Sequence, residues 1–104
     1  MAQITPPDFI NVGGKRIPVV VKSELPGRLA EYDPEKRCIN IVESILEDRN
    51  VFRDTLVHEV LHCALDLAGI SFNTSGVLSE KVEEQVVTAV ETLAAPAIIR
   101  VWRL

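Results

Sequence analysis

The chain has 104 residues, of which 11 are Lys or Arg and 15 are Asp or Glu, so its formal net charge is -4. This length fits one small domain, residues 1–104, and a content of 47% hydrophobic residues excludes a chain that is disordered throughout. The acidic balance, without a cluster of basic residues, argues against nucleic acid as the main partner, because phosphate binding needs local positive charge.

The cysteine content and the lengths of the apolar runs indicate the cellular compartment. The cysteines, Cys38 and Cys63, are too few for a disulfide framework and are interpreted as buried apolar thiols. The longest apolar runs, such as Ile17 to Val21 and Ala94 to Ile99, are far shorter than the roughly 20 residues that cross a bilayer. The sequence therefore predicts a reduced, cytoplasmic protein that has no membrane partner.

The first half of the chain, residues 9–42, is predicted to form strands. Phe9 to Val12 and Lys15 to Lys22 flank Gly13-Gly14, which supplies the positive φ angles of a two-residue hairpin turn. Pro18 has no N–H group to donate, so we expect the second strand to be an edge or to be interrupted there.

A second hairpin is predicted to follow. Arg28 to Asp33 and Arg37 to Val42 are separated by a turn that contains Pro34, and the second segment is rich in branched residues. The two hairpins together predict a small antiparallel sheet, and with the helices that follow they predict an α+β fold.

The first predicted helix covers residues 45–68. Ser44 and Glu47 have the spacing of a capping box at its start, and Gly69 is placed to end it. The polar segment from Ser71 to Gly76 is predicted to be a mobile surface loop.

The second predicted helix covers residues 79–95. Ser79 caps it and Pro96 is expected to break it. The tail, residues 96–104, contains Trp102 and is apolar enough to pack. We expect it to pack within the chain, with a dimer contact as the alternative, and the oligomeric state stays open.

The most informative motif is H-E-x-x-H, formed by His58, Glu59 and His62 inside the first predicted helix. Residues four apart lie on one helix face, so both imidazoles can bind one Zn²⁺ at about 2.0 to 2.1 Å. Glu59 is rotated by roughly 100° about the helix axis and can accept a proton from a water polarised by the metal. This arrangement predicts metal-assisted hydrolysis with Glu59 as the general base.

A simpler interpretation is that the two histidines belong to a helix that matches the motif by chance. Against it, both histidines of the sequence lie in the motif, and most residues around them are uncharged. Two imidazoles and a carboxylate on such a helix would be costly to bury without partners, which favours the metal site.

A catalytic zinc needs a third protein ligand, and the sequence offers Glu80, Glu83 and Glu84 in the second helix. We expect the apolar stripe of that helix to face the first helix; it consists of Val82, Val86, Val90 and Leu93. Glu83 borders this stripe and ranks first, whereas Glu84 ranks second as a solvated residue and Glu80 ranks third.

Predicted hairpins, a helix with T-L-V-H-E-V-L-H and a second helix that opens E-K-V-E-E-Q-V-V resemble the zincin-fold metallopeptidases of the gluzincin type. The chain looks most like the short zinc-dependent peptidases of phages and prophages, the minigluzincins. It is similar, more distantly, to the peptidase domain of antirepressors that induce mobile elements. The resemblance covers roughly residues 10–95.

The resemblance implies one Zn²⁺ per chain held by His58, His62 and a glutamate of the second helix, with Glu59 as general base and acid. It also implies a protein or peptide substrate, either a host or a phage protein, in the host cytosol. The strand expected to pair with an extended substrate comprises Cys38, Ile39, Asn40, Ile41 and Val42.

Two departures from larger peptidases of this type stand out. The larger peptidases use an extra His, Tyr or Arg to stabilise the oxyanion of the tetrahedral intermediate. Here Tyr32 is the single tyrosine and is interpreted mainly as a packing residue. The chain also lacks a subdomain for the far wall of a cleft. A latent or non-catalytic binding module on the same scaffold, with a structural zinc, is therefore the alternative function.

Overall fold

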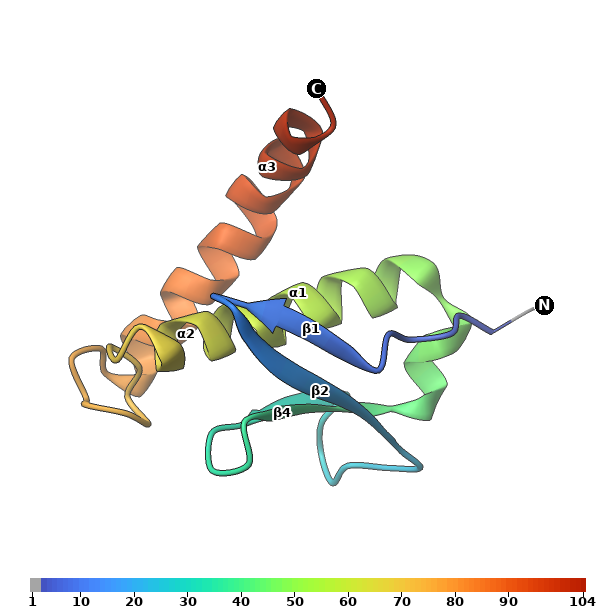
Figure 1. Cartoon of the computed structure of the whole chain (residues 1–104), viewed down its shortest axis with the longest axis horizontal. Coiled ribbons are helices and arrows are strands. Elements are labelled where there is room, and N and C mark those ends of the chain that lie inside the picture. The colour runs from blue at the N-terminus through green and yellow to red at the C-terminus, as the bar shows by residue number, and fades with distance from the viewer. Residues whose placement is uncertain (1–2) are drawn as a thin grey trace.

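The computed structural model describes residues 3–104, and within this range the strands precede the helices in an α+β arrangement (Figure 1). The strands are β1 (Phe9–Val12), β2 (Lys15–Lys22), β3 (Ala30–Asp33) and β4 (Cys38–Val42). The helical elements are the 3-10 helix η1 (Glu43–Glu47), α1 (Arg49–Leu67), α2 (Glu80–Ala89), the π-helix η2 (Val90–Ala94) and α3 (Ala95–Trp102).

The sheet is mixed, with the strand order β1-β2-β4-β3. Each predicted hairpin is antiparallel, but the two hairpins meet through β2 and β4, which run parallel. The prediction of a purely antiparallel sheet is therefore wrong, because local turn signals fix each hairpin but not how two hairpins join. Pro18 is the last residue of β2 that pairs with β1, and pairing with β4 begins at Val19, so the strand changes partner where the N–H is missing.

The first hairpin turn forms as predicted. Gly13 and Gly14 have φ angles of 56° and 81°, the left-handed values that a two-residue type I′ turn requires at both positions. The turn between β3 and β4 is fixed by Asp33, whose Oδ1 accepts hydrogen bonds from the backbone N–H groups of Glu35 and Lys36.

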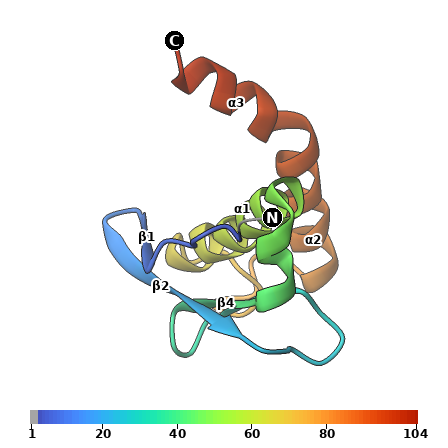
Figure 2. The same cartoon turned by 90° about the vertical axis from the view of Figure 1, so that its right-hand side faces the viewer.

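The core lies between one face of the sheet and α1, which crosses it (Figure 2). It is built from branched side chains of the strands and η1 and from Cys63 of α1; its buried members are Ile17, Val19, Ala30, Ile39, Ile41, Ile45, Leu46 and Cys63. All five residues of β4 are buried, so this strand is the centre of the core. Burial raises the pKa of the Cys63 thiol, in keeping with the predicted apolar role.

The start of α1 differs from the prediction. Asp48 is the N-cap, and its side chain accepts hydrogen bonds from the N–H groups of Asn50 and Val51 at 3.0 and 3.2 Å. Ser44 lies inside η1, which has no side-chain cap, so the predicted capping box is wrong. The end of α1 is as predicted, with Gly69 at a φ of 79°.

The second helix does not stop at Pro96. Ser79 caps it as predicted, and α2, η2 and α3 follow without a break. The N–H of Ala95 donates to the carbonyl of Val90, which is the wider hydrogen bond of a π turn. This wider turn leaves room for the proline ring. Pro96 itself lies at the start of α3, where its missing N–H costs little. We refer to residues 80–102 as the rod.

The end of the rod projects from the body of the molecule and carries the C-terminus (Figure 1). Trp102 is 86% exposed, so the expectation that the tail packs within the chain is wrong. No helix in residues 3–104 is long and apolar enough to cross a membrane.

Mutations can distinguish the observed cap of α1, Asp48, from the predicted one, Ser44. Asp48→Ala removes the acceptor of two N–H groups and should lower the free energy of unfolding by about 1 kcal/mol. The exposed Ser44 makes no cap, so Ser44→Ala should change it by less than about 0.5 kcal/mol. Urea denaturation of both variants measures the difference, and equal losses would contradict the assignment of Asp48 as the cap.

Candidate metal centre

The motif residues His58, Glu59 and His62 lie in α1, between the sheet and the rod. The histidine side chains are 26% and 13% exposed, and their rings meet edge to face with centroids 5.0 Å apart. Both imidazoles therefore lie on one face of the helix, as their spacing predicts.

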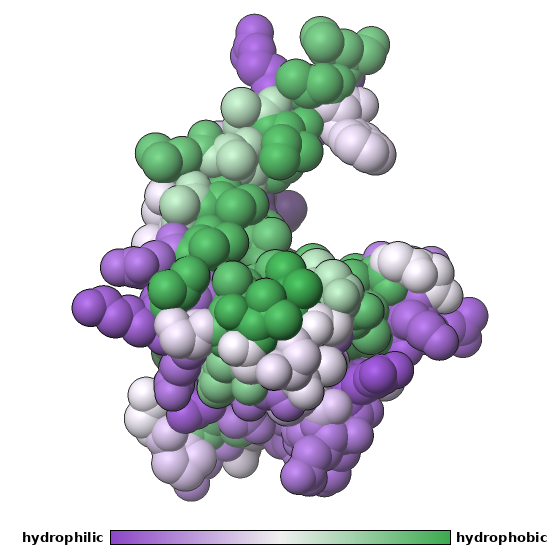
Figure 3. Space-filling view, turned by 90° about the vertical axis from the view of Figure 1, so that its left-hand side faces the viewer, coloured by the Kyte–Doolittle hydropathy of each residue, from purple (hydrophilic) through white to green (hydrophobic). Residues whose placement is uncertain are grey.

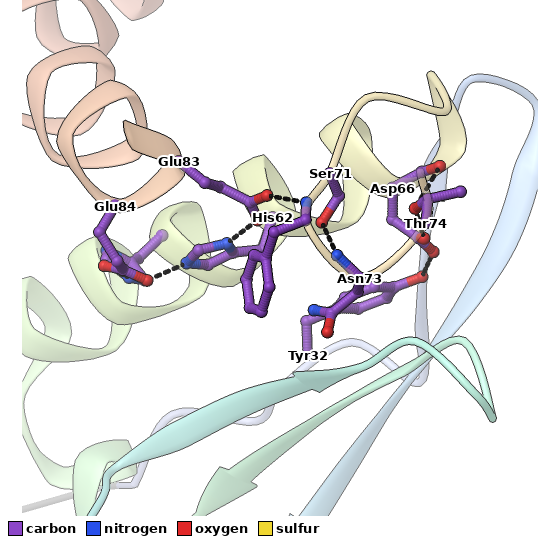
Figure 4. A network of polar contacts seen from close by, with 10 residues as sticks. Tyr32, His62, Asp66, Ser71, Asn73, Thr74, Glu83 and Glu84 are labelled. Atoms are coloured by element: carbon purple, nitrogen blue, oxygen red, sulfur yellow. Dashed lines mark hydrogen bonds and ion pairs between the residues drawn. The ribbon is translucent and has the colours of Figure 1, made fainter. Parts of the chain in front are cut away.

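Two consecutive glutamates of α2 hold His62 from opposite sides (Figure 4). Glu83 Oε2 lies 2.6 Å from His62 Nδ1, and Glu84 Oε1 lies 2.8 Å from Nε2. The ionised Glu83 carboxylate accepts a hydrogen bond from Nδ1 of His62, and the other ring nitrogen, Nε2, is directed towards Glu84.

His58 has a similar environment. Its Nδ1 lies 2.7 Å from Glu91 Oε2, and its Nε2 lies 3.6 Å from the second carboxylate oxygen of Glu84. Glu91 belongs to η2, so α2 and η2 supply the carboxylates that orient both rings. The Nε2 atoms of both histidines thus converge on Glu84.

His58, His62 and Glu84 form the candidate metal centre: one ligand atom from each lies within 4.8 Å of the other two. Two imidazole nitrogens and one carboxylate oxygen are a zinc donor set that leaves a position for water. The surroundings fit a cation, because three further carboxylates, those of Glu59, Glu83 and Glu91, border the two rings.

Glu84, which ranked second in the prediction, belongs to the cluster, whereas the first-ranked Glu83 does not. Glu83 contacts Nδ1 of His62, on the side of the ring away from the point where the Nε2 atoms and Glu84 meet. Glu83 therefore supports a ligand, and Glu84 is placed to be one. Glu80 lines the same hollow as the two histidines and Glu84 but is not part of the cluster.

The expectation that the apolar stripe of α2 faces α1 is wrong, because most of the stripe points outwards. Val82 and Val86 are 42% and 37% exposed, whereas Val87 is 1% exposed. The side of α2 that faces α1 is instead occupied by Glu83, Val87 and, in the next turns, Glu91. Hydrophobic periodicity marks the wrong face when buried carboxylates are fully bonded.

Glu83 is fully buried yet ionised. Burial acts to raise its pKa, but hydrogen bonds from His62, from the N–H of Phe72 at 3.0 Å and from the Ser71 hydroxyl outweigh it and hold the pKa below its ordinary value. A buried carboxylate with these donors fixes both His62 and the start of the loop that follows α1.

Glu59 is 8% exposed and lies beside the two histidines. Burial raises its pKa above the ordinary range, while the neighbouring imidazoles of His58 and His62 act in the opposite direction. The backbone of Tyr32 donates a hydrogen bond to its carboxylate. A buried carboxylate of raised pKa beside two imidazoles is suited to accept and deliver a proton.

Tyr32 does not point at the metal centre. Its hydroxyl donates to Asp66 Oδ2 at 2.6 Å, and Asp66 also accepts a hydrogen bond from Thr74 (Figure 4). Burial and the Asp66 carboxylate raise the pKa of the phenol far above its usual value. The hydroxyl is therefore a structural donor, which agrees with the packing role predicted for this residue.

The loop predicted to be mobile is held by hydrogen bonds. Ser71 is 1% exposed and its carbonyl accepts from the N–H groups of Thr74, Ser75 and Gly76. The Thr74–Asp66 contact joins the loop to α1. Sequence analysis missed Asp66, Thr74 and Glu91, because each acts through a partner more than seven residues away and carries no local motif.

Two hollows meet at the motif. One of about 390 Å³ is lined by Tyr32, His62, Glu84 and residues of the loop, and one of about 430 Å³ is lined by Leu29, Thr55 and Glu91. Both are bordered by Ala30, His58 and Glu59. The two hollows therefore adjoin at these three residues, beside β3, and we refer to them together as the cleft.

The strand next to this cleft is β3 and not β4. β4 lies between β2 and β3 and pairs with both, so the residues predicted to pair with an extended substrate have no free backbone edge; they are Cys38, Ile39, Asn40, Ile41 and Val42. The prediction is corrected accordingly: the strand with an unpaired edge on the histidine side is Ala30–Asp33.

Comparisons with protein-family models, with curated proteins and with solved structures give no match to this chain.

The zinc affinities of glutamate variants can show which glutamate binds the metal and which supports a ligand. Glu83→Gln, which keeps the shape but weakens the contact to Nδ1, should lower affinity about 10- to 100-fold. Glu84→Gln removes a ligand charge and should lower it further. Glu80→Gln, on the same helix, serves as the control and should bind zinc like the parent. Competition with a chromophoric chelator measures all three; stronger loss in Glu83→Gln than in Glu84→Gln would overturn the assignment of Glu84.

Proposed function

We propose that this protein is a zinc-dependent peptidase that hydrolyses a peptide bond with Glu59 as general base. The observation that carries the proposal is the convergence of His58 Nε2, His62 Nε2 and Glu84 on one point of a cleft that Glu59 also lines. This donor set and base are those of metal-assisted hydrolysis.

A zinc ion held by these three residues would polarise the scissile carbonyl and lower the pKa of a water molecule to about 7. Glu59 accepts the proton of the attacking water and later delivers it to the leaving amine nitrogen. Its low exposure keeps the Glu59 carboxylate poorly hydrated. Glu83 and Glu91 hold the imidazoles in the tautomers that present Nε2.

The free edge of β3 is suited to an extended peptide. Val42 donates to the carbonyl of Leu29 at 2.9 Å, so by antiparallel alternation the N–H and C=O groups of Ala30 point away from β4, towards the cleft. A peptide strand added at Ala30 would pass Glu59 and His58 through both hollows. We infer a protein or peptide substrate, acted on in the cytosol, for example of a phage-infected host.

One observation favours the alternative, a latent enzyme or a zinc-stabilised binding module. Tyr32 is hydrogen-bonded to Asp66, and Arg28, which lines the hollow of about 390 Å³, is exposed and lies 3.4 Å from Glu31. Neither side chain is aimed at a developing oxyanion. Under this alternative, zinc stabilises the fold and the cleft binds a partner without cleaving it.

Glu59→Gln separates the two functions. The variant keeps all three ligands, so zinc content should stay at one per chain, while hydrolysis of a fluorogenic peptide pool should fall by about 10²- to 10⁴-fold. Glu47→Gln, an exposed glutamate of η1, is the matched control and should keep parental activity.

Either of two results would contradict the peptidase. Activity of Glu59→Gln equal to that of the parent would remove Glu59 as the base. A zinc-loaded parent that cleaves no peptide, but whose melting temperature falls when zinc is removed, would support the binding module instead.

A further inference from the structure

The outer side of the rod carries an exposed apolar stripe. Its members recur at spacings of three or four residues and are all exposed: Val82, Val86, Ala89, Leu93, Ala97 and Val101. Leu93 is 78% exposed and Val101 is 63% exposed. Hydrophobic side chains gather along the rod on this face, from the body to the C-terminal end (Figure 3). A stripe of this length on a helix is normally covered.

The π turn keeps the stripe straight. A run of spacings of four drifts steadily around an α-helix, because four residues exceed one turn. The wider turn of η2, residues 90–94, offsets this excess, so Val101 at one end of the stripe stays near the line of Val82 at the other. The rod is 23 residues long, which gives a straight apolar face of about 35 Å.

We propose that this stripe is a dimer interface, on which the rods of two copies of this chain pair antiparallel about a two-fold axis at Leu93. Leu93 is midway between Val82, the first residue of the stripe, and the exposed Leu104 beyond its end. Antiparallel pairing about Leu93 therefore sets Ala89 against Ala97 and Val82 against Leu104. The small alanines let the backbones approach beside the central leucines, and the surface is complementary to itself.

The charges of the rod favour the antiparallel direction. α2 holds three glutamates and one lysine, whereas residues 92–104 hold Arg100 and Arg103 and no acidic residue. Antiparallel pairing places the acidic beginning of one rod beside the basic end of the other, and the helix dipoles then oppose each other as well. Parallel pairing would place like charges together.

Charge also favours a second copy over an anionic membrane. The two arginines of the tail leave 9 basic and 15 acidic residues on residues 1–91, a net charge of -6. A lipid surface that attracts the tail would repel the body from which it projects. The body of a second copy, in contrast, attracts the basic tail.

Analytical ultracentrifugation tests the interface. The parent should sediment as a dimer, at twice 11.5 kDa, at roughly micromolar concentrations. Leu93→Glu places two like charges at the two-fold axis and should weaken association by at least about 100-fold. Because Leu93 is exposed, the variant should keep the fold of the monomer, which circular dichroism checks. Val51→Glu, at an exposed apolar residue of α1, is the control and should stay dimeric.

Cysteine cross-linking tests the direction. Both native cysteines are buried, so an added exposed cysteine is the reactive one. Leu93→Cys should form a disulfide-linked dimer on mild oxidation, whereas Val82→Cys should not, because its two copies would lie about 33 Å apart. Cross-linking of both variants would indicate a parallel pair and overturn the antiparallel arrangement.

Three other results would overturn the proposal. The parent could be monomeric at all concentrations, Leu93→Glu could remain dimeric, or Leu93→Glu and Val51→Glu could weaken association equally. A monomer that co-sediments with vesicles of anionic phospholipid, but not with neutral ones, would assign the stripe to a membrane instead. None of these results depends on zinc or on peptidase activity.

Discussion

The contact between Glu83 and His62 connects the main parts of this molecule. A carboxylate with no solvent exposure joins α2 to α1 through His62 and fixes the loop between them through Ser71 and Phe72. Because a buried charge without donors would be strongly unfavourable, α2 can dock only where these three partners meet. That docking also places Glu84 and Glu91 against the two histidines, so the geometry of the candidate metal centre follows from a structural interaction.

Most of the local structure could be predicted from the sequence. Gly13-Gly14, Ser79 and Gly69 each act within a few residues, and the structure has a hairpin turn, a helix cap and a helix end at these positions. The spacing of His58 and His62 likewise needs only helical geometry to place both rings on one face. The strands next to Pro18 were predicted, but the expectation of an edge strand or an interruption there is wrong: β2 runs through Pro18 as an inner strand and changes partner.

What could not be predicted depends on contacts between distant residues. The pairing of β2 with β4 joins two hairpins whose turns carry no information about each other. The choice between Glu83 and Glu84 depends on which side of α2 is buried, and Val82 and Val86 suggested the wrong side. Hydrophobic patterns report burial in general, but the inner side of this helix carries the bonded carboxylate of Glu83 beside Val87, while Val82 and Val86 lie outside.

The two faces of the rod can be understood together. Its inner face is polar because it must hold two imidazoles, and each carboxylate there takes a position that an ordinary helix would give to an apolar residue. The inner face therefore contributes little hydrophobic burial, and the apolar residues of the rod, such as Leu93, lie on the side away from the body. Covering that outer face would supply stability that the inner face cannot. The carboxylates that hold the histidines and the exposed apolar stripe thus lie on opposite sides of the same rod, and the polar inner side explains why apolar residues are on the outer side.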